Sequence, residues 1–246
     1  MANSLFHILN ISRQDMLARL QELDTTSNNL ANINTVGYKS QRINFQELLK
    51  QTQQNGVFLP STQVMTDQGT LRNTGNGLDL GLTGTGYFQV KMADGQVGYS
   101  RDGQFNLDAN HDIVNASGMR LVWQGKIPED AEEVEVQLDG KLMTRQGSAW
   151  TQAGQIQLAR FTNPSALMEK GKNIYVPNQN SGSPQLGNPG TVPFGDIRAG
   201  TLEQSNVDSA GEMTRMMLLQ RNFQISVRSF QQTDTMISEA IQMRRA

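Results

Sequence analysis

Apolar residues spaced alternately three and four positions apart, at both ends of this 246-residue chain, constrain its fold more than any other feature. The N-terminal stripe comprises Phe6, Leu9, Met16, Leu20, Leu23 and Leu30, with Arg13 and Ser27 as polar interruptions. The C-terminal stripe comprises Met213, Met216, Phe223, Val227, Phe230, Ile237 and Ile241, with Gln220 and Asp234 as polar interruptions. This spacing is typical of helices that bury a narrow seam against another helix. We therefore expect a helix at each end of the chain, and a coiled-coil domain formed by the two.

Polar residues predict how these helices begin and pair. Ser209 and, three positions later, Glu212 form a capping-box pattern, so the C-terminal helix is expected to begin there. An antiparallel register that places Arg13 opposite Asp234 pairs the polar interruptions with each other and the apolar positions with apolar positions. Polar seam residues often set the register of a coiled coil, so we expect this register. The alternative is that these polar residues face neighbouring molecules.

The middle of the chain is rich in Gly, Asn and Asp and alternates apolar with polar residues, which indicates β-structure. Residues 86–91 and 134–138 are predicted strands, and the dipeptides at 94–95 and 139–140 are typical of tight hairpin turns. The expected fold class is α+β, with a central all-β domain inserted between terminal helices. The predicted division is an N-terminal helix over 1–33, an extended connector over 34–71, the β-domain over 72–200 and a C-terminal helix over 201–246.

Composition narrows the classes of function. The formal net charge of −2 gives no reason to expect nucleic acid or an anionic membrane as a partner, because both select for clustered positive charge. The chain has no cysteine, so a disulfide framework and a thiolate metal site are both excluded. The N-terminal segment lacks the features of a cleavable signal peptide, and no apolar run is long enough to cross a bilayer. We expect no membrane insertion and no cofactor.

A series of motifs resembles the flagellar basal-body rod and hook proteins in order and spacing. The motif at 27–39 resembles the N-terminal signature of that family, and the motif at 200–208 resembles its C-terminal signature. Segments at 68–80, 84–90, 99–105 and 161–175 resemble its central blocks. The signature residues are Asn29, Leu30, Ala31, Asn32, Thr35, Gly37, Tyr38 and Lys39 near the start, and Leu202, Glu203, Ser205, Asn206 and Val207 near the end.

Length and one further segment point to a particular branch of this family. Hook proteins carry an additional outer β-domain, for which a 246-residue chain has little room. Residues 126–136 look most like the distal rod protein. A proximal-rod paralogue with a single β-domain is the main alternative.

The resemblance implies a structural protein with assembly surfaces and no catalytic site. It implies copies of the chain in a helical tube, with the terminal helices lining the inner wall, which transmits torque from motor to hook and houses the export channel. The implied partners are other rod proteins, the hook protein, the export apparatus and rod-cap factors. The implied location is the basal body in the cell envelope, reached by flagellar type III export. The apolar seam residues of both stripes are then the expected interface, and Asn29 to Lys39 the expected turn.

One short element resembles the hydrophobic signal that rod and hook substrates present to the export gate. It comprises Phe45, Leu48 and Leu49. The alternative is an amphipathic turn that packs on its own connector.

Two other classes of function are weaker interpretations of the same sequence. A glycosidase needs two carboxylates around a sugar-sized cleft, but Asp102, Asp108 and Asp112 stand beside turn residues. The segment 108–112 imitates the start of a calcium loop without its required glycine, so a turn is expected there. A secreted adhesin could use the β-domain, but it has no need for matched stripes at its two ends.

Overall fold

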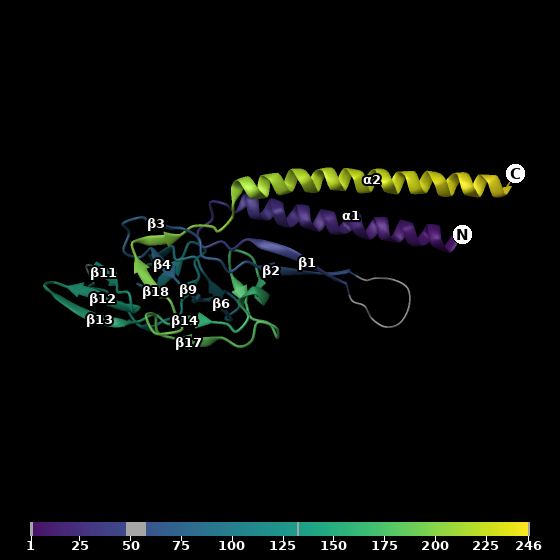
Figure 1. The fold of residues 1–246 in the computed structure, drawn as a ribbon. Coiled ribbons are helices and arrows are strands. Elements are labelled where there is room, and N and C mark those ends of the chain that lie inside the picture. Colours follow the sequence, from purple (N-terminus) through teal and green to yellow (C-terminus); the bar gives the residue numbers. More distant parts are fainter. Residues whose placement is uncertain (1, 48–57, 132, 246) are drawn as a thin grey trace. The chain divides into compact units, whose positions relative to one another are not determined.

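The computed structural model describes residues 2–47, 58–131 and 133–245, and its fold is α+β (Figure 1). Helices α1 (Ala2–Ala31) and α2 (Ser209–Arg245) flank a β-rich region, as predicted. The chain forms two compact units. Unit 1 comprises Met1–Ala31, Gln41–Gln63 and Asp208–Ala246, and unit 2 comprises Asn32–Ser40 and Val64–Val207. The chain therefore passes between the units at residues 31/32, 40/41, 63/64 and 207/208.

Unit 1 contains the two helices and a short sheet. Helices α1 and α2 lie side by side and run antiparallel (Figure 1). Strands β1 (Gln41–Glu47) and β2 (Phe58–Val64) pair with each other in the segment predicted to be an extended connector. Of the described residues, no helix is both long and apolar enough to cross a membrane.

The helices pair in a different register from the predicted one. The Ser226 hydroxyl donates a hydrogen bond to Asp15 Oδ2, whereas the predicted register would place Asp15 opposite Gln231 or Gln232. Arg13 and Asp234 are both exposed instead of facing each other across a seam. An exposed position spares these charges the cost of desolvation, so they need no partner in the seam.

The seam itself is displaced by one residue at alternate positions of both helices. The predicted positions that recur every seventh residue are half-buried: Met16, Leu23 and Leu30 in α1, and Met216, Phe223, Phe230 and Ile237 in α2. Between them, Thr26 is buried where Ser27 was expected, and Leu219 and Thr233 are buried where Gln220 and Asp234 were expected. Leu20 is 46% exposed, so its predicted pairing with Val227 is wrong. Burying Leu219 and Thr233 avoids burying an amide and a carboxylate.

Unit 2 consists of β-sheets. Its largest sheet has seven strands in the order β15-β16-β6-β5-β9-β8-β7, and a second has four in the order β10-β13-β12-β11. The strands of these two sheets are β5 (Phe88–Lys91), β6 (Val97–Ser100), β7 (Phe105–Leu107), β8 (Ile113–Asn115), β9 (Arg120–Leu121), β10 (Gln124–Gly125), β11 (Glu133–Val136), β12 (Lys141–Gln146), β13 (Ala149–Gln155), β15 (Met168–Glu169) and β16 (Tyr175–Val176). A 3-10 turn, η1 (Pro164–Ala166), precedes β15.

Three two-stranded sheets complete unit 2 and two of them join its first strands to its last. The pairs are β3 (Leu71–Asn73) with β19 (Thr201–Glu203), β4 (Leu80–Thr83) with β18 (Asp196–Ala199), and β14 (Leu158–Arg160) with β17 (Gln185–Gly187). All three pairs are antiparallel. Because β18 and β19 lie at the end of the unit's sequence, unit 2 is complete only when its last residues have joined its first.

The predicted hairpin turns are confirmed. Gly95 and Gly140 have φ angles of 81° and 77°, the left-handed geometry that a tight turn needs, and they connect β5 to β6 and β11 to β12. The calcium-like segment is a turn between β7 and β8, as expected. In it, Asp108 Oδ1 accepts hydrogen bonds from the backbone N–H groups of Asn110 and Asp112.

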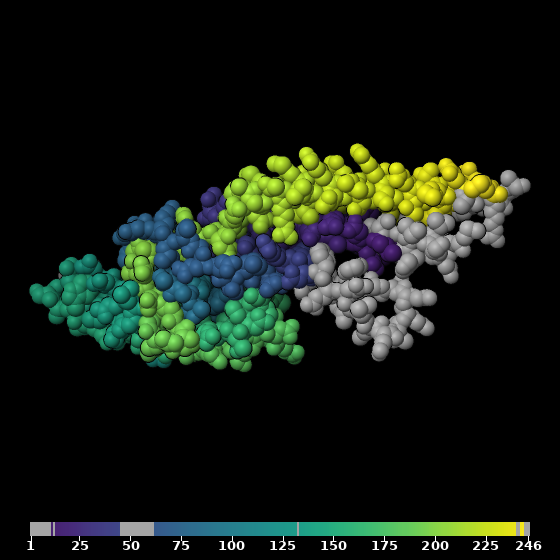
Figure 2. Space-filling model, viewed as in Figure 1, coloured from purple at the N-terminus to yellow at the C-terminus, as the bar shows by residue number. Residues whose placement is uncertain are grey.

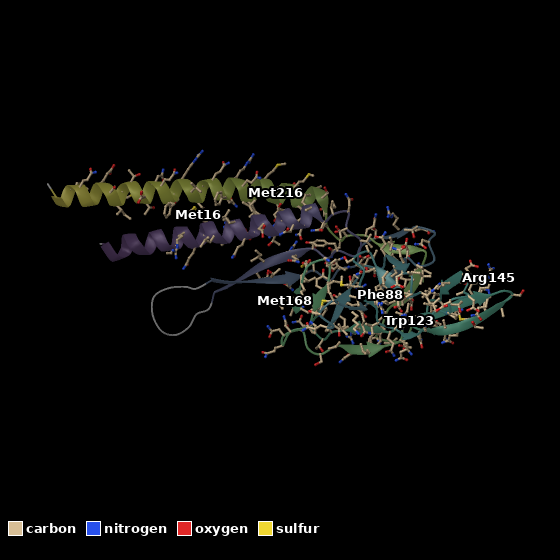
Figure 3. The ribbon with its side chains drawn as sticks, turned by 180° about the vertical axis from the view of Figure 1, so that it is seen from behind. Met16, Phe88, Trp123, Arg145, Met168 and Met216 are labelled. Atoms are coloured by element: carbon tan, nitrogen blue, oxygen red, sulfur yellow. The ribbon has the colours of Figure 1, made fainter. Side chains whose placement is uncertain are left out.

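Two groups of buried apolar residues hold unit 2 together. The larger group includes Phe88, which is labelled in Figure 3, and Phe105. Their rings meet edge to face with centroids 5.3 Å apart. The smaller group is mainly aromatic and includes Tyr87, Phe161 and Tyr175. Aromatic side chains contribute large apolar areas to a core, so these two groups supply most of the driving force for folding this unit.

Candidate functional site

The N-terminal signature forms a tight turn directly after α1. The Thr35 N–H donates to the Asn32 carbonyl oxygen at 3.1 Å, and its hydroxyl donates to Asn32 Oδ1 at 3.1 Å. Gly37 then adopts a φ of +65°, and a Cβ on it would lie only 2.4 Å from the backbone carbon of Arg101. Glycine is therefore required at this point both for the direction of the chain and for the close approach.

A buried charged cluster joins this turn to the C-terminal signature. Glu203 Oε1 lies 2.6 Å from Lys39 Nζ, and Glu203 Oε2 lies 3.3 Å from Arg101 Nη1. The side chains of Glu203 and Lys39 are 0% and 1% exposed, and that of Arg101 is almost as fully buried. The backbone N–H of Gly69 donates a further hydrogen bond to Glu203 Oε1 at 3.0 Å. The carboxylate is thus the acceptor on which three distant segments of unit 2 converge.

The cluster holds two cations and one anion, and backbone carbonyl oxygens partly compensate for the excess positive charge. Lys39 Nζ also donates to the Asp67 carbonyl at 2.7 Å, and Arg101 Nη2 donates to the Gly84 carbonyl at 2.8 Å. The Arg101 guanidinium lies 5.1 Å from the ring centroid of Tyr87, which is a cation–π distance. Burial lowers the pKa of the Lys39 ammonium, and the Glu203 carboxylate opposes this effect. The ammonium therefore depends on Glu203 for its charge.

Asn206 makes a second set of contacts beside this cluster. Its Oδ1 accepts a hydrogen bond from the Ser40 N–H at 2.7 Å. Its Nδ2 donates to the carbonyl oxygens of Met65 at 3.1 Å and Asp67 at 3.0 Å. Its backbone N–H donates to the Tyr38 carbonyl at 3.4 Å. One side chain of the C-terminal signature therefore satisfies groups on both sides of the β1–β2 segment.

Sequence reasoning named several of these residues without their roles. It included Lys39, Glu203 and Asn206 as signature residues, and the structure brings all three together. It missed Arg101 as a partner of Glu203. The only available signal was that Arg101 lies within a motif shared with the family, because nothing in the local pattern marks it as buried.

The residues predicted as an assembly interface lie on the two helices of unit 1. Met16 lies on α1 and Met216 on α2 (Figure 3). Met213 is 47% exposed, in contrast to its half-buried neighbour Met216. The side chains of Phe6, Leu9 and Ile241 lie outside the described part of the structure. Phe45 belongs to β1, and the other two residues of the predicted export element, Leu48 and Leu49, lie outside the described residues.

The helices also expose apolar side chains, and all but Leu20 and Met213 lie outside the predicted seams. Side chains of α2 stand out along the surface of unit 1 in Figure 2. The exposed apolar residues are Ile11, Leu17 and Leu20 in α1, and Met213, Met217, Leu218, Ile225, Met236 and Met243 in α2. Exposed apolar side chains that gather on one surface are typical of protein interfaces, which makes the two helices the candidate surface for assembly.

Other titratable groups of unit 2 offer little for chemistry. Burial raises the pKa of the Asp102 carboxyl group, and the nearby Asp79 carboxylate raises it further. Asp102 Oδ1 accepts the Gln104 N–H at 3.0 Å, so this carboxylate takes part in a turn. Within the described residues, no three His, Asp or Glu side chains lie close enough together to hold a metal ion.

Comparison with known proteins gives three family matches and several relatives of similar length. Residues 9–39 match the flagella basal body rod protein family, residues 81–144 the D1 domain of the flagellar hook proteins FlgE/F/G, and residues 198–243 the C-terminal region of the flagellar basal body rod FlgEFG proteins. Each of these segments contributes one member of the charged cluster: Lys39, Arg101 and Glu203.

Relatives from three bacteria support a single branch of the family. The flagellar basal-body rod protein FlgG of Agrobacterium fabrum is 33% identical, over 94% of this chain and 96% of its own length. FlgG of Bacillus subtilis is 33% identical over 91% and 94%, and FlgG of Borreliella burgdorferi is 30% identical over 94% and 96%. These matches support the distal-rod interpretation of the sequence. The chain therefore belongs to the FlgG family of flagellar basal-body rod proteins and is a structural subunit of the flagellar rod.

Proposed function

We propose that copies of this chain assemble through α1 and α2 into the helical tube of the distal rod. The observation that supports this most directly is the set of exposed apolar side chains on both helices. Ile225 is 64% exposed and Leu218 is 54% exposed, although the helices already lie against each other. The pairing of α1 with α2 thus leaves apolar surface that a neighbouring subunit can cover.

Burial of these apolar side chains would favour polymerisation. Burying the exposed part of an aliphatic side chain contributes roughly 1 kcal/mol, because full burial of such a side chain is worth about 1.5–3 kcal/mol. Nine such side chains stand on the described parts of the helices. Assembly would also stabilise the helices, since helices gain most of their stability from packing an apolar face. We propose that the paired helices form a coiled-coil domain within the tube.

The wider proposal follows from membership of the rod family. The tube transmits torque from the motor to the hook and encloses the export channel, and the chain has no catalytic role. Its neighbours are further copies, other rod proteins and the hook protein. It reaches the rod by flagellar type III export, with the help of the export apparatus and rod-cap factors. Phe45, Leu48 and Leu49 are the proposed export element.

A charge introduced on the exposed helix surface tests this proposal. In the double variant Leu218→Glu/Ile225→Glu, two carboxylates would have to be buried at the interface between subunits. The part of the rod built from this protein should then not form, and the hook should have nothing to assemble on. The matched control is Gln224→Glu/Gln231→Glu, which adds the same charge at exposed polar positions of the same helix. The expected result is immotile cells without hooks for the first variant and motile cells for the control, with both proteins equally helical by circular dichroism. Normal swimming by the first variant would contradict the proposal.

A further inference from the structure

The points at which the chain passes between units 1 and 2 are bound to one another inside unit 2. Ser40 adjoins the passage at 40/41, Met65 lies just after the one at 63/64, and Asn206 lies just before the one at 207/208. The Asn206 side chain contacts both of the others, at 2.7 Å and 3.1 Å. A single residue therefore joins three of the four passages.

Glu203 contributes a second layer to the same arrangement. Its carbonyl oxygen accepts the Gly37 N–H at 2.7 Å, and its carboxylate accepts hydrogen bonds from Lys39 Nζ and the Gly69 N–H. Next to it, the Gln204 N–H donates to the Thr70 carbonyl at 2.8 Å. We name the segments 37–40, 65–70 and 203–206 the clasp.

The clasp differs in kind from the rest of unit 2. The contacts described above for the clasp are hydrogen bonds and ion pairs. Its Tyr38 side chain is buried, but among the described residues no clasp member belongs to either of the two buried apolar groups. A polar network depends on every partner being in place, so the loss of one member weakens the others. The sheet core, in contrast, is held by apolar packing that does not involve residues 203–206. These two kinds of stabilisation can therefore fail separately.

We propose that the clasp opens and closes as one cooperative unit while the seven-stranded and four-stranded sheets of unit 2 stay folded, with Glu203 and Asn206 as its positioning residues. Closing it gathers the chain passages that lead to β1, from β2 and to α2. This rests on the proposed function in one respect. In a subunit exported as an unfolded chain, the clasp can close only after both signatures have emerged, so the helix connections are fixed only in a complete subunit.

Hydrogen exchange on the purified full-length chain tests this proposal. Four backbone amides report on the clasp, those of Gly37, Ser40, Gly69 and Gln204, and the amides of β5 report on the sheets. In the parent protein the four clasp amides should exchange at a common opening rate that is faster than the rate for β5. Exchange of the clasp amides at the rate of β5 would overturn the proposal without the need for any variant.

A matched pair of variants sharpens the test. Asn206→Ala should raise exchange at all four clasp amides by a similar factor, about 10-fold to 100-fold for the loss of several hydrogen bonds, and leave β5 unchanged. Asn115→Ala is the control, because Asn115 is also a buried asparagine whose Oδ1 accepts two backbone N–H groups, at 3.0 Å and 2.9 Å. It should leave the clasp amides unchanged. Faster exchange at Ser40 alone, the amide that loses its acceptor, would refute cooperativity.

These measurements separate the clasp from the proposed function. Hydrogen exchange is measured on the monomeric protein in dilute solution, so it does not depend on assembly into a rod. Motility of the Leu218→Glu/Ile225→Glu variant depends on assembly and does not touch the clasp. A negative exchange result together with immotile cells would refute the clasp alone, and the reverse pair of results would refute the helix interface alone.

Discussion

Replacing Glu203 by alanine should destabilise unit 2 more than any exposed substitution in the chain. The carboxylate is fully buried between Lys39 and Arg101 and also accepts the Gly69 N–H. Its removal leaves two buried cations without a counter-charge and one backbone donor without an acceptor. Both effects cost free energy in the folded state and nothing in the unfolded state, where water solvates all three groups.

The expected loss is about 4 kcal/mol in the free energy of unfolding. Removing one partner of a buried ion pair costs about 3–5 kcal/mol. A value in the middle of this range is expected for two reasons. The variant loses the short 2.6 Å ion pair with Lys39 completely, and the 3.3 Å ion pair with Arg101 is weaker, so its loss adds less. Domains of ordinary size are stable by only about 5–15 kcal/mol, so this loss is a large part of the total.

Tryptophan fluorescence during urea denaturation measures this change in unit 2 by itself. The chain has two tryptophans, Trp123 and Trp150, and both belong to unit 2. The matched control is Glu135→Ala, an exposed glutamate on β11 whose loss should change stability by less than about 0.5 kcal/mol. A Glu203→Ala variant within about 1 kcal/mol of the parent would refute the argument that the cluster is stabilised by this carboxylate.

The pH dependence of the same variant provides an independent check on the cause. Burial lowers the pKa of Lys39 below its ordinary value of 10.5, and Glu203 opposes this effect. Between the folded and unfolded pKa values the unfolded chain binds more protons, so stability rises with pH. Without Glu203 the pKa of Lys39 falls further and this window extends to lower pH. The deficit of Glu203→Ala should therefore narrow as the pH is raised from 7 towards 10, and a deficit that widens would exclude this cause.

Three smaller predictions follow from single features of the structure. Gly37→Ala should lower the free energy of unfolding by about 3 kcal/mol and Gly75→Ala by about 1 kcal/mol, as measured by urea denaturation. Both glycines have a positive φ, but only at Gly37 would a Cβ lie 2.4 Å from backbone. Asp102→Asn should raise the free energy of unfolding at pH 7. The pKa of the Asp102 carboxyl group is raised in the folded state, so the parent loses stability as the pH rises through that pKa. The variant lacks this carboxyl group, so urea denaturation over the same pH range should show a smaller loss. Asp208→Ala should lower helix stability by about 1 kcal/mol and Ser209→Ala by much less, as followed by circular dichroism, because Asp208 Oδ1 accepts the Ala210 N–H.

The last of these predictions corrects the sequence-based one for the start of α2. The capping-box pattern pointed to Ser209, but the residue before it supplies the cap, and Glu212 Oε2 is buried without a hydrogen-bond partner among the described residues. Aspartate and serine are nearly equal as capping residues, so two of them in succession leave the helix start ambiguous by one position. The local sequence pattern therefore predicted the helix and its approximate start, whereas the structure was needed to identify Asp208 as the capping residue.

The register of the helix pair was ambiguous for a similar reason. Met216, Phe223, Phe230 and Ile237 recur every seven residues and belong to the seam in both interpretations. The position between them can be three or four residues further on, and both choices fit a heptad pattern. The predicted seam uses the four-residue step, which contains Gln220 and Asp234, whereas the structure buries Leu219 and Thr233. Weighing the desolvation of Asp234 against the burial of Leu219 would have favoured the observed seam.

Long-range contacts were beyond the reach of local pattern altogether. The hairpins of unit 2 were predicted because Asp-Gly turns connect strands that are neighbours in sequence. The cluster of Lys39, Arg101 and Glu203 joins residues that no periodicity connects, and a buried charge has no local signature. Lys39 and Glu203 belong to the family signatures, but their contact depends on the pairing of strand β3 with β19 and of strand β4 with β18.

The position of this cluster explains why the two signatures stand at opposite ends of the β-rich region. Lys39 and Arg101 both precede Glu203 in the sequence, so a unit that lacks the C-terminal signature would bury two cations without their counter-charge. Buried charges without a partner cost more than a single apolar contact returns, which makes the folded state of such a partial unit unfavourable. The complete chain removes that cost in one step, when the carboxylate meets the ammonium. Electrostatic pairing across the whole unit thus makes a finished subunit more stable than any partial one, which is a property that a rod built from intact subunits requires.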